Sequence, residues 1–233
     1  MLVPARRRGF EHLDDPAIDA ALRERSLRDV RRANTVLGGR WAVLREVRRL
    51  LPTVGSSMSL LDVGTGLADI PAGVRSMGAG RGVTITTIGV DEAASLARVS
   101  AGLLDGSACA DARQLPFADH SLDVVICSQV LHHFADDDIP AVLRELTRVA
   151  RRAVIVSDLR RSWLAAAGFW VVTWPLGFHP VSRHDGLTSV LRGFTGPELD
   201  AHIRAIGERA TIRRHPGFRL TATWSPDNAG AHT

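Results

Sequence analysis

The strongest constraint on the fold is an apolar run that ends in a glycine turn. Residues 60–63 are apolar apart from one aspartate, and a Gly-Thr-Gly turn follows at 64–66. A second apolar run, 83–90, ends in Asp91, which lies 25 positions after Gly66. The pattern predicts a strand whose glycine loop lets a nucleotide-like ligand approach the backbone. It also predicts a second strand whose terminal carboxylate accepts two ribose hydroxyls.

Position 69 separates two classes of nucleotide ligand. The dinucleotide fingerprint G-x-G-x-x-G requires a third glycine where this chain has Asp69, so a carboxylate would face a pyrophosphate. S-adenosylmethionine has no phosphate and carries an ammonium and a sulfonium, both of which tolerate an acid at this position. The residues therefore predict an S-adenosylmethionine site.

Charge and length narrow the class of protein. A chain of 233 residues is long enough for one sizeable core and too short for two full domains. All 29 basic residues are arginine, the formal net charge is only +4, and the arginines are interspersed with acids. Because no region carries a field of one sign, nucleic acid is not an expected partner.

The cysteines and the apolar segment near residue 170 bear on location. Cys109 and Cys127 both fall in predicted central strands, so we expect buried thiols rather than a disulfide or a metal pair. The apolar stretch 163–178 is shorter than a bilayer span and is interrupted by Pro175, and no secretory signal is recognisable. We therefore expect a cytoplasmic protein with no integral membrane segment.

Strand and helix patterns alternate along the chain. Residues 14–50 show helical spacing and predict two helices that form an N-terminal cap over 1–52. The domain expected at 53–233 has a segment at about 160–195 that covers an acceptor, and it ends in a hairpin. Alternation of this kind implies a doubly wound α/β fold with a mostly parallel sheet and helices on both faces. The first predicted strand ends at Asp62, and the later strands span 83–90, 107–110, 122–127, 153–157, 210–214 and 218–224. The predicted helices span 68–77, 93–104, 140–150 and 196–206.

Several motifs in this order resemble the class I S-adenosylmethionine-dependent methyltransferases. The resemblance is strongest to the ubiquinone/menaquinone-type branch and to the small-molecule tailoring branch of polyketide and phenolic pathways. It covers roughly residues 60–224 and implies a seven-stranded Rossmann-like sheet whose last strand lies antiparallel between the fifth and sixth. The matching motifs are Leu61-Asp62-Val63-Gly64-Thr65-Gly66, Gly89-Val90-Asp91, Cys109-Ala110-Asp111-Ala112, Leu115-Pro116-Phe117, Ser121-Leu122-Asp123-Val124-Val125 and His132-His133-Phe134.

The resemblance implies roles for the residues at these positions. Gly64, Thr65 and Gly66 would form the loop beneath the methionine part of the cofactor, and Asp62 would hold that loop and the ammonium group. The remaining roles follow the order of the motifs: Asp91 on the ribose, Asp111 and Ala112 at the adenine, Ser128 near the sulfonium, and Asp69 at the start of the following helix.

Histidines supply the candidate bases. Methyl transfer needs a base only where the acceptor hydroxyl must lose its proton, and histidine titrates near neutrality. His132 and His133 follow the fourth strand, and of these two His133 is the preferred candidate. His184 is the second candidate, although on an extended chain it would point away from its neighbour Asp185.

Weaker signals concern the acceptor. His179, Asn34 and Trp41 are candidate substrate contacts, although Trp41 also suits a core position on an amphipathic helix. The chain has no tyrosine, so Phe, Trp, Leu and Val must build the pocket, which favours a flat apolar acceptor. We expect O-methylation of a small phenolic or enolic acceptor in secondary metabolism.

Other functions stay open. One is C-methylation of a quinol-like ring, in which segment 163–178 would meet a prenyl tail. Another is a protein of this fold that binds S-adenosylmethionine without transferring its methyl group. Nucleic-acid methylation is disfavoured, because Ser128-Gln129-Val130-Leu131 stands where amino-methylating enzymes carry an Asn/Asp-Pro-Pro-aromatic signature. The dispersed histidines and cysteines indicate no metal site, and the oligomeric state is left open.

Overall fold

A seven-stranded sheet forms the centre of the described part of the chain, in a computed structural model that describes residues 3–7, 9–15 and 17–226. The sheet order is β3-β2-β1-β4-β5-β7-β6. The pairings among β1 to β5 are parallel, and β7 runs antiparallel to both of its neighbours. The expected doubly wound fold with a C-terminal antiparallel hairpin is confirmed. The strands are β1 (Ser57–Val63), β2 (Thr84–Asp91), β3 (Gly106–Cys109), β4 (Leu122–Ser128), β5 (Ala150–Leu159), β6 (Thr211–His215) and β7 (Arg219–Trp224).

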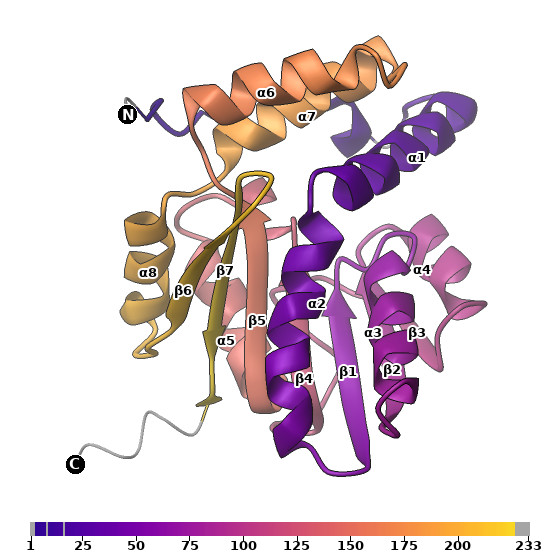
Figure 1. The fold of residues 1–233 in the computed structure, drawn as a ribbon, viewed down its shortest axis with the longest axis vertical. Helices are drawn as coiled ribbons and strands as arrows, with labels where there is room; N and C mark the ends of the chain where they lie inside the picture. The colour runs from indigo at the N-terminus through magenta and orange to yellow at the C-terminus, as the bar shows by residue number, and fades with distance from the viewer. Residues whose placement is uncertain (1–2, 8, 16, 227–233) are drawn as a thin grey trace.

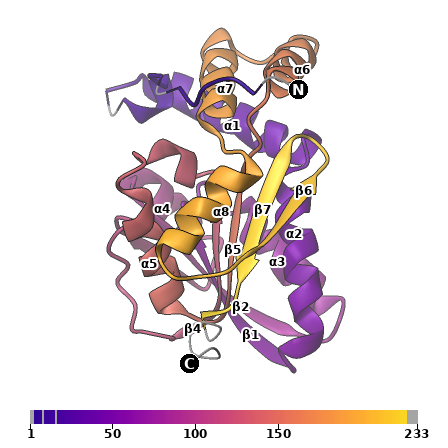
Figure 2. The same ribbon diagram turned by 90° about the vertical axis from the view of Figure 1, so that its left-hand side faces the viewer.

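Helices cover both faces of this sheet (Figures 1 and 2). The helices α2 (Gly39–Leu50) and α3 (Asp69–Ala79) pack on one face, where Val43 and Val74 join the core with Ile126. The helices α5 (Ile139–Val149) and α8 (Gly196–Ala205) pack on the other face, and α4 (Ala94–Ala101) lies against β2 and β3. Central strands are therefore buried on both sides, as a parallel sheet requires.

A cap lies over the carboxyl ends of the parallel strands (Figure 1). It consists of the N-terminal residues 3–7 and 9–15, α1 (Ala20–Val36), α6 (Trp163–Thr173) and α7 (Pro180–Arg192). The N-terminal segment is tied to α7, because the Arg7 amide donates to the Leu191 carbonyl and Asp185 accepts the His12 and Leu13 amides. Of the two helices expected in a cap over 1–52, α1 lies there, whereas α2 packs on the sheet.

The helix α7 corrects the expectation of an extended segment after β5. Pro180 lies in the first turn of this helix, and Gly186 lies inside it. The structure gives Gly186 a packing reason, since a Cβ there would lie 2.1 Å from Cζ of Phe169 on α6. The glycine allows α6 and α7 to approach closely, so it marks a helix–helix contact rather than a break.

Two expectations about burial are also wrong. Cys109 is exposed, because β3 is the edge strand of the sheet, whereas Cys127 on the central strand β4 is buried as expected. Trp41 is 45 % exposed, so it is not a core residue of α2. Its ring lies edge-on to His215 at a centroid distance of 5.8 Å and beneath the guanidinium of Arg45.

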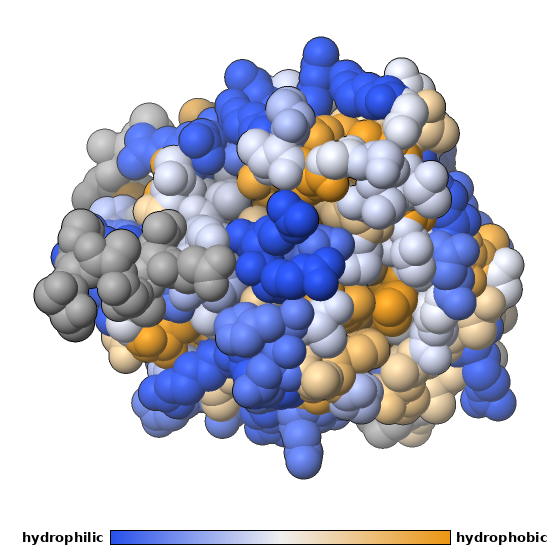
Figure 3. All heavy atoms as spheres, turned by 90° about the horizontal axis from the view of Figure 1, so that it is seen from below, coloured by the Kyte–Doolittle hydropathy of each residue, from blue (hydrophilic) through white to orange (hydrophobic). Residues whose placement is uncertain are grey.

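The end of the sheet remote from the cap presents a mixed surface. Seen from below, hydrophilic side chains separate the hydrophobic patches of this face (Figure 3). Within the described ranges, none of the helices combines the length and the apolar character needed to cross a bilayer.

The contact between α5 and the sheet should contribute strongly to stability. Leu146 is fully buried on α5, whereas Leu103 is 52 % exposed. We expect Leu146→Ala to lower the free energy of unfolding by about 2–5 kcal/mol, through lost burial and a residual cavity. Leu103→Ala should change it by less than about 0.5 kcal/mol. Denaturant titration followed by circular dichroism measures both, and equal effects would contradict this account of the core.

Candidate active site

The glycine loop joins β1 to α3 at the carboxyl edge of the sheet. Gly64 and Gly66 have φ values of +74° and +51°, which glycine adopts without strain. A Cβ on Gly64 would lie 2.1 Å from Cγ2 of Val130, so no side chain fits there. The Gly66 amide donates to Oδ2 of Asp91 at 3.0 Å, and this bond fixes the loop of β1 to the end of β2.

Asp62 lies beneath this loop in an unusual state. It is buried, and its Oδ1 atom has no hydrogen-bond partner within the described residues. Burial is the largest cause of a raised pKa for this carboxyl, and the nearby carboxylates of Asp69 and Asp91 add to it, so that the pKa reaches about 8. Burial also raises the pKa values of Asp69 and Asp91. Three acids that are largely buried favour a cationic ligand, and the ammonium and sulfonium groups of S-adenosylmethionine are both cations.

The other residues expected at the cofactor lie in different surroundings: one lines the cavity, and the rest are buried or mostly buried. Ala112 lines the cavity described below, together with Gly64, Gly66 and Asp91. Thr65 is buried against Gly89, and Ser128 is buried at the end of β4 with its hydroxyl unpartnered within the described residues. Asp69 begins α3, and its carboxylate is mostly buried near Arg40.

Asp111 is held by a neighbour. Nη2 of Arg113 lies 2.6 Å from its Oδ2 atom, and hydrogen bonds from Arg113 lower the pKa of the Asp111 carboxyl. The carboxylate is partly exposed and Asp111 does not line the cavity, so an adenine contact would require Arg113 to release it.

A cavity of about 980 Å³ lies between the glycine loop and the cap. Its wall runs from Asp91 at the end of β2, past the ends of β4 and β5, to apolar side chains of α1, α6 and α7. The volume is at the upper end of the range for ligand pockets, which leaves room for a cofactor together with a small acceptor. Asn34 lines it, whereas Trp41, His179 and His184 do not. The apolar side chains of the cap wall include Leu27, Val30, Phe169, Val172, Phe178 and Val190.

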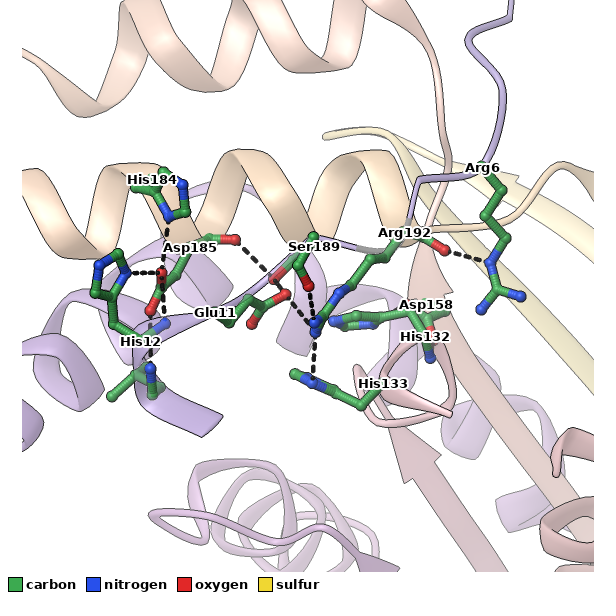
Figure 4. Close-up of polar contacts among 12 residues, drawn as sticks. Arg6, Glu11, His12, His132, His133, Asp158, His184, Asp185, Ser189 and Arg192 are labelled. Carbon is green, nitrogen blue, oxygen red and sulfur yellow. Dashed lines mark hydrogen bonds and ion pairs between the residues drawn. The ribbon is translucent and has the colours of Figure 1, made fainter. Parts of the chain in front are cut away.

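His132 is the histidine with a buried carboxylate partner. Its Nδ1 atom lies 2.7 Å from Oδ1 of Asp158, and its Nε2 atom is buried without a hydrogen-bond partner within the described residues (Figure 4). Asp158 also accepts the amides of His132 and Leu159. Burial alone would raise the pKa of the Asp158 carboxyl, but His132 and these hydrogen bonds hold it below its ordinary value.

His133 and His184 lie in different surroundings. His133 is exposed and lines the cavity, with its Nδ1 atom 3.2 Å from Nη1 of Arg192. His184 is half-exposed on α7, and its Nδ1 atom lies 3.1 Å from Oδ1 of Asp185. The two residues share a helix, so the expectation that they point apart is wrong. His12 contacts the same carboxylate oxygen at 3.0 Å (Figure 4).

His179 lies at the start of α7 and does not line the cavity. Its side chain caps this helix, and its amide donates to Asp29 at 3.0 Å.

Two groups of described residues bring three potential metal ligands within 4.8 Å of one another: Glu11, His132 and His133, and His12, His184 and Asp185. In the first group, Nη1 of Arg192 contacts Glu11 at 2.9 Å as well as His133, which sets a positive charge against a metal ion.

Sequence reasoning missed three residues that line or support this cavity. Asp158 was missed because the predicted strand 153–157 ended immediately before it, although a buried acid at the end of a central strand is itself a signal. Arg160 and Arg219 line the cavity from β5 and β7, and nothing in their local sequence distinguishes them from the chain's many other arginines.

Comparisons with known proteins agree with this geometry. Residues 61–156 match the family model described as a methyltransferase domain. A comparison with curated proteins finds no significant match.

Solved structures share the fold at low sequence identity. A SAM-dependent methyltransferase from Aquifex aeolicus is 15% identical, with 78% of this chain and 88% of that chain covered and a TM-score of 0.55. The YcgJ protein from Bacillus subtilis is 19% identical, with coverages of 73% and 70% and a TM-score of 0.50. The CurJ carbon methyltransferase is 14% identical, with coverages of 80% and 54% and a TM-score of 0.58.

At these identities the structural likeness establishes the fold, and the family match adds the activity. Residues 61–156 hold the glycine loop, Asp91 and His132. This part of the chain matches a methyltransferase domain, and the whole chain has the Rossmann-like fold of S-adenosylmethionine-dependent methyltransferases. The chain is an enzyme, and S-adenosylmethionine is its cofactor.

Proposed function

We propose that this enzyme transfers the methyl group of S-adenosylmethionine to the oxygen of a small aromatic or apolar acceptor, a phenol or an enol of secondary metabolism. The observation that carries the proposal is the His132–Asp158 dyad, whose ring lines the cavity between the cofactor loop and the apolar cap. A positioned base is useful where a hydroxyl must lose its proton.

The dyad sets the tautomer of the base. A carboxylate accepts hydrogen bonds only, so the proton of neutral His132 lies on Nδ1, which donates to Asp158. The Nε2 atom then carries the lone pair, and it is the atom without a protein partner within the described residues. This arrangement favours His132 over His133 as the base.

Bound S-adenosylmethionine would supply a methyl group activated by the sulfonium, and three roles fall to the residues of this chain. The apolar cap positions the acceptor and excludes water from the cavity. His132 accepts the acceptor's hydroxyl proton at Nε2 as the oxygen attacks the methyl carbon. Asp158 stabilises the imidazolium that forms, and the methyl–sulfur bonding pair stays with the sulfur.

We propose the cofactor contacts in the same terms. Gly64 and Gly66 would pass beneath the methionine part, Asp91 would accept the ribose hydroxyls, and Asp62 would face the ammonium. Thr65, Asp69, Ala112 and Ser128 would complete the surroundings of the cofactor, and Asp111 would reach the adenine once Arg113 releases it.

A second candidate is C-methylation of a quinol-like ring. It is favoured by α6, which exposes Trp163, Leu164 and Val171 to solvent at the cap, where a prenyl tail could lie. The CurJ carbon methyltransferase shares the fold. Cofactor binding without formation of S-adenosylhomocysteine would instead support a non-methylating role.

We also propose a cytoplasmic location, supported by two cysteines that form no disulfide.

The base assignment is testable by substitution. We expect His132→Gln and Asp158→Asn to lower kcat by about 10²- to 10⁴-fold, because each removes the proton acceptor or its correct tautomer. The affinity for S-adenosylhomocysteine should stay within a few-fold of wild type. His184→Gln, on the outer side of α7, is the matched control. Methyl transfer to a panel of phenols, followed by S-adenosylhomocysteine release, measures kcat, and a larger loss in His133→Gln would favour His133 instead.

Asp91 tests the cofactor site. Asp91→Ala removes both the carboxylate that would hold the ribose and the bond to the Gly66 amide. We expect micromolar binding of S-adenosylhomocysteine in the wild type to weaken by at least about 10-fold. Glu24→Ala, on the exposed face of α1, should bind like the wild type. Calorimetric titration measures all three proteins, and absence of binding to the wild type would reject the function.

The raised pKa of Asp62 predicts how binding depends on pH. Its ordinary value is 3.8 and its value in the fold is about 8, so at pH 6 the cofactor-free fold holds a proton that an ammonium partner would displace. The affinity for S-adenosylhomocysteine should therefore rise from pH 6 to pH 8, by up to about tenfold per pH unit. Asp62→Asn should bind more weakly and lose most of this rise. Equal pH profiles in the two proteins would contradict an ionised Asp62 in the complex.

The same shift has a consequence for folding. Between about pH 4 and pH 8 the unfolded chain has released the Asp62 proton that the native state keeps, so this group lowers the stability of the cofactor-free protein as pH rises. In Asp62→Asn this contribution should be absent, and denaturant midpoints at pH 5 and pH 8 measure it.

A further inference from the structure

Arg219 is a buried cation in the cavity wall. Its side chain is 2 % exposed at the start of β7, and burial lowers the pKa of its guanidinium to about 10. It donates to neutral acceptors only, the Oε1 atom of Gln129 at 2.7 Å and the carbonyl of Leu37 at 3.2 Å. No carboxylate of the described residues forms a direct ion pair with it, although the buried Asp158 carboxylate attracts its charge from a greater distance. A buried charge without a direct partner is costly.

The contacts of Arg219 hold it in place. Gln129 adopts a positive φ of 58°, and its side-chain amide donates in turn to Asn34 on α1. The guanidinium is therefore fixed between β4, α1 and β7, with its charge at the cavity. A cation that the protein positions without pairing it directly to an acid can bind an anionic ligand group.

Arg160 supplies a second cation to the same wall. It follows β5, next to the position where Leu159 pairs with Arg219, and its guanidinium stacks over the ring of Phe218 at 5.1 Å. Its buried Nε atom has no hydrogen-bond partner, and within the described residues no acid pairs with it. Two unpaired guanidiniums thus line a cavity that is otherwise mostly apolar at this end.

The two arginines lie on the acceptor side of the sheet. The glycine loop and Asp91 mark the cofactor at the ends of β1 and β2, and the sheet continues from β1 through β4 to β5 and β7. At a strand spacing of ~4.8 Å, β5 and β7 stand about 10 Å and about 14 Å from β1. His132 lies between the two regions, following β4.

We infer that Arg160 and Arg219 bind a carboxylate of the methyl acceptor, so that the acceptor is an apolar acid. The inference rests on the proposed function, because it assumes that the cavity holds a cofactor and an acceptor together. The planar donor fork of a guanidinium matches the two oxygens of a carboxylate. The apolar walls of the cap would receive the body of the acid. The methionine carboxylate of the cofactor has the same chemistry and is the competing source.

A matched pair of probes tests this site. Calorimetric titration with 1-naphthoate and with the neutral 1-naphthamide, in the presence of saturating S-adenosylhomocysteine, compares an acid with an amide of the same shape. We expect the wild type to bind the acid at least about 10-fold more tightly than the amide. Arg160→Gln and Arg219→Gln should abolish this preference while leaving the amide affinity unchanged.

Two controls separate the inference from a structural effect. Arg160→Gln loses no hydrogen bond to protein from its Nε atom, so it should fold even if Arg219→Gln, which also frees Gln129, is destabilised. Arg204→Gln, exposed on α8, removes an arginine far from the cavity wall and should keep the wild-type preference. Thermal unfolding of each variant verifies that it is folded.

Decarboxylated S-adenosylhomocysteine tests whether the two arginines bind the carboxylate of the cofactor instead. If the variants weaken S-adenosylhomocysteine binding but not that of the decarboxylated compound, the arginines hold the cofactor's own carboxylate and the acceptor assignment is wrong. The acceptor assignment is also wrong if the wild type shows no preference for naphthoate over naphthamide, including no binding of either, or if both variants retain the preference. Titration of wild type with S-adenosylhomocysteine alone reports on the proposed function separately.

Discussion

Desolvation of carboxylates at the ends of the parallel strands governs this site. Asp62 is the last residue but one of β1 and Asp158 is the last residue but one of β5, and both are buried. Asp158 receives His132 and two backbone amides, so it stays ionised, whereas Asp62 has an unpartnered oxygen and two acidic neighbours, so its pKa rises to about 8. One residue type thereby provides a fixed negative charge at one strand and a group awaiting a cation at another.

The cap makes this desolvation possible, and it is assembled from distant parts of the chain. The N-terminal residues 3–7 and 9–15 and the helix α1 precede the first strand, whereas α6 and α7 follow the fifth. Asp185 joins the two parts by accepting amides from residues 12 and 13, and Glu11 contacts Ser189 and Arg192 on α7. Access to the cavity therefore depends on polar contacts between the N-terminal segment and α7, while the sheet beneath them is held by a continuous apolar core.

The sheet and the cofactor loop could be predicted from sequence because their signals are local. A run of apolar residues, a Gly-x-Gly turn and a terminal acid each restrict the backbone within a few residues, as Gly64 and Asp91 show. The cap could not be predicted in the same way, since Gly186 reads as a helix breaker until the ring of Phe169 is placed against it. The choice between His132 and His133 depends on Asp158, which lies 26 positions away and reaches only one of them.

The charges of the cavity give the two ligands an orientation. Acids stand at the ends of β1 and β2, and guanidiniums that the described acids leave unpaired stand at β5 and β7. A cationic methyl donor is drawn to the first end and an anionic acceptor to the second, because opposite charges attract more strongly beside apolar walls than in bulk water. The two ligands then meet beside β4, where the Nε2 atom of His132 is available to accept a proton. Orientation by opposite charges would let a mostly apolar cavity align a reaction without many directional contacts to the acceptor.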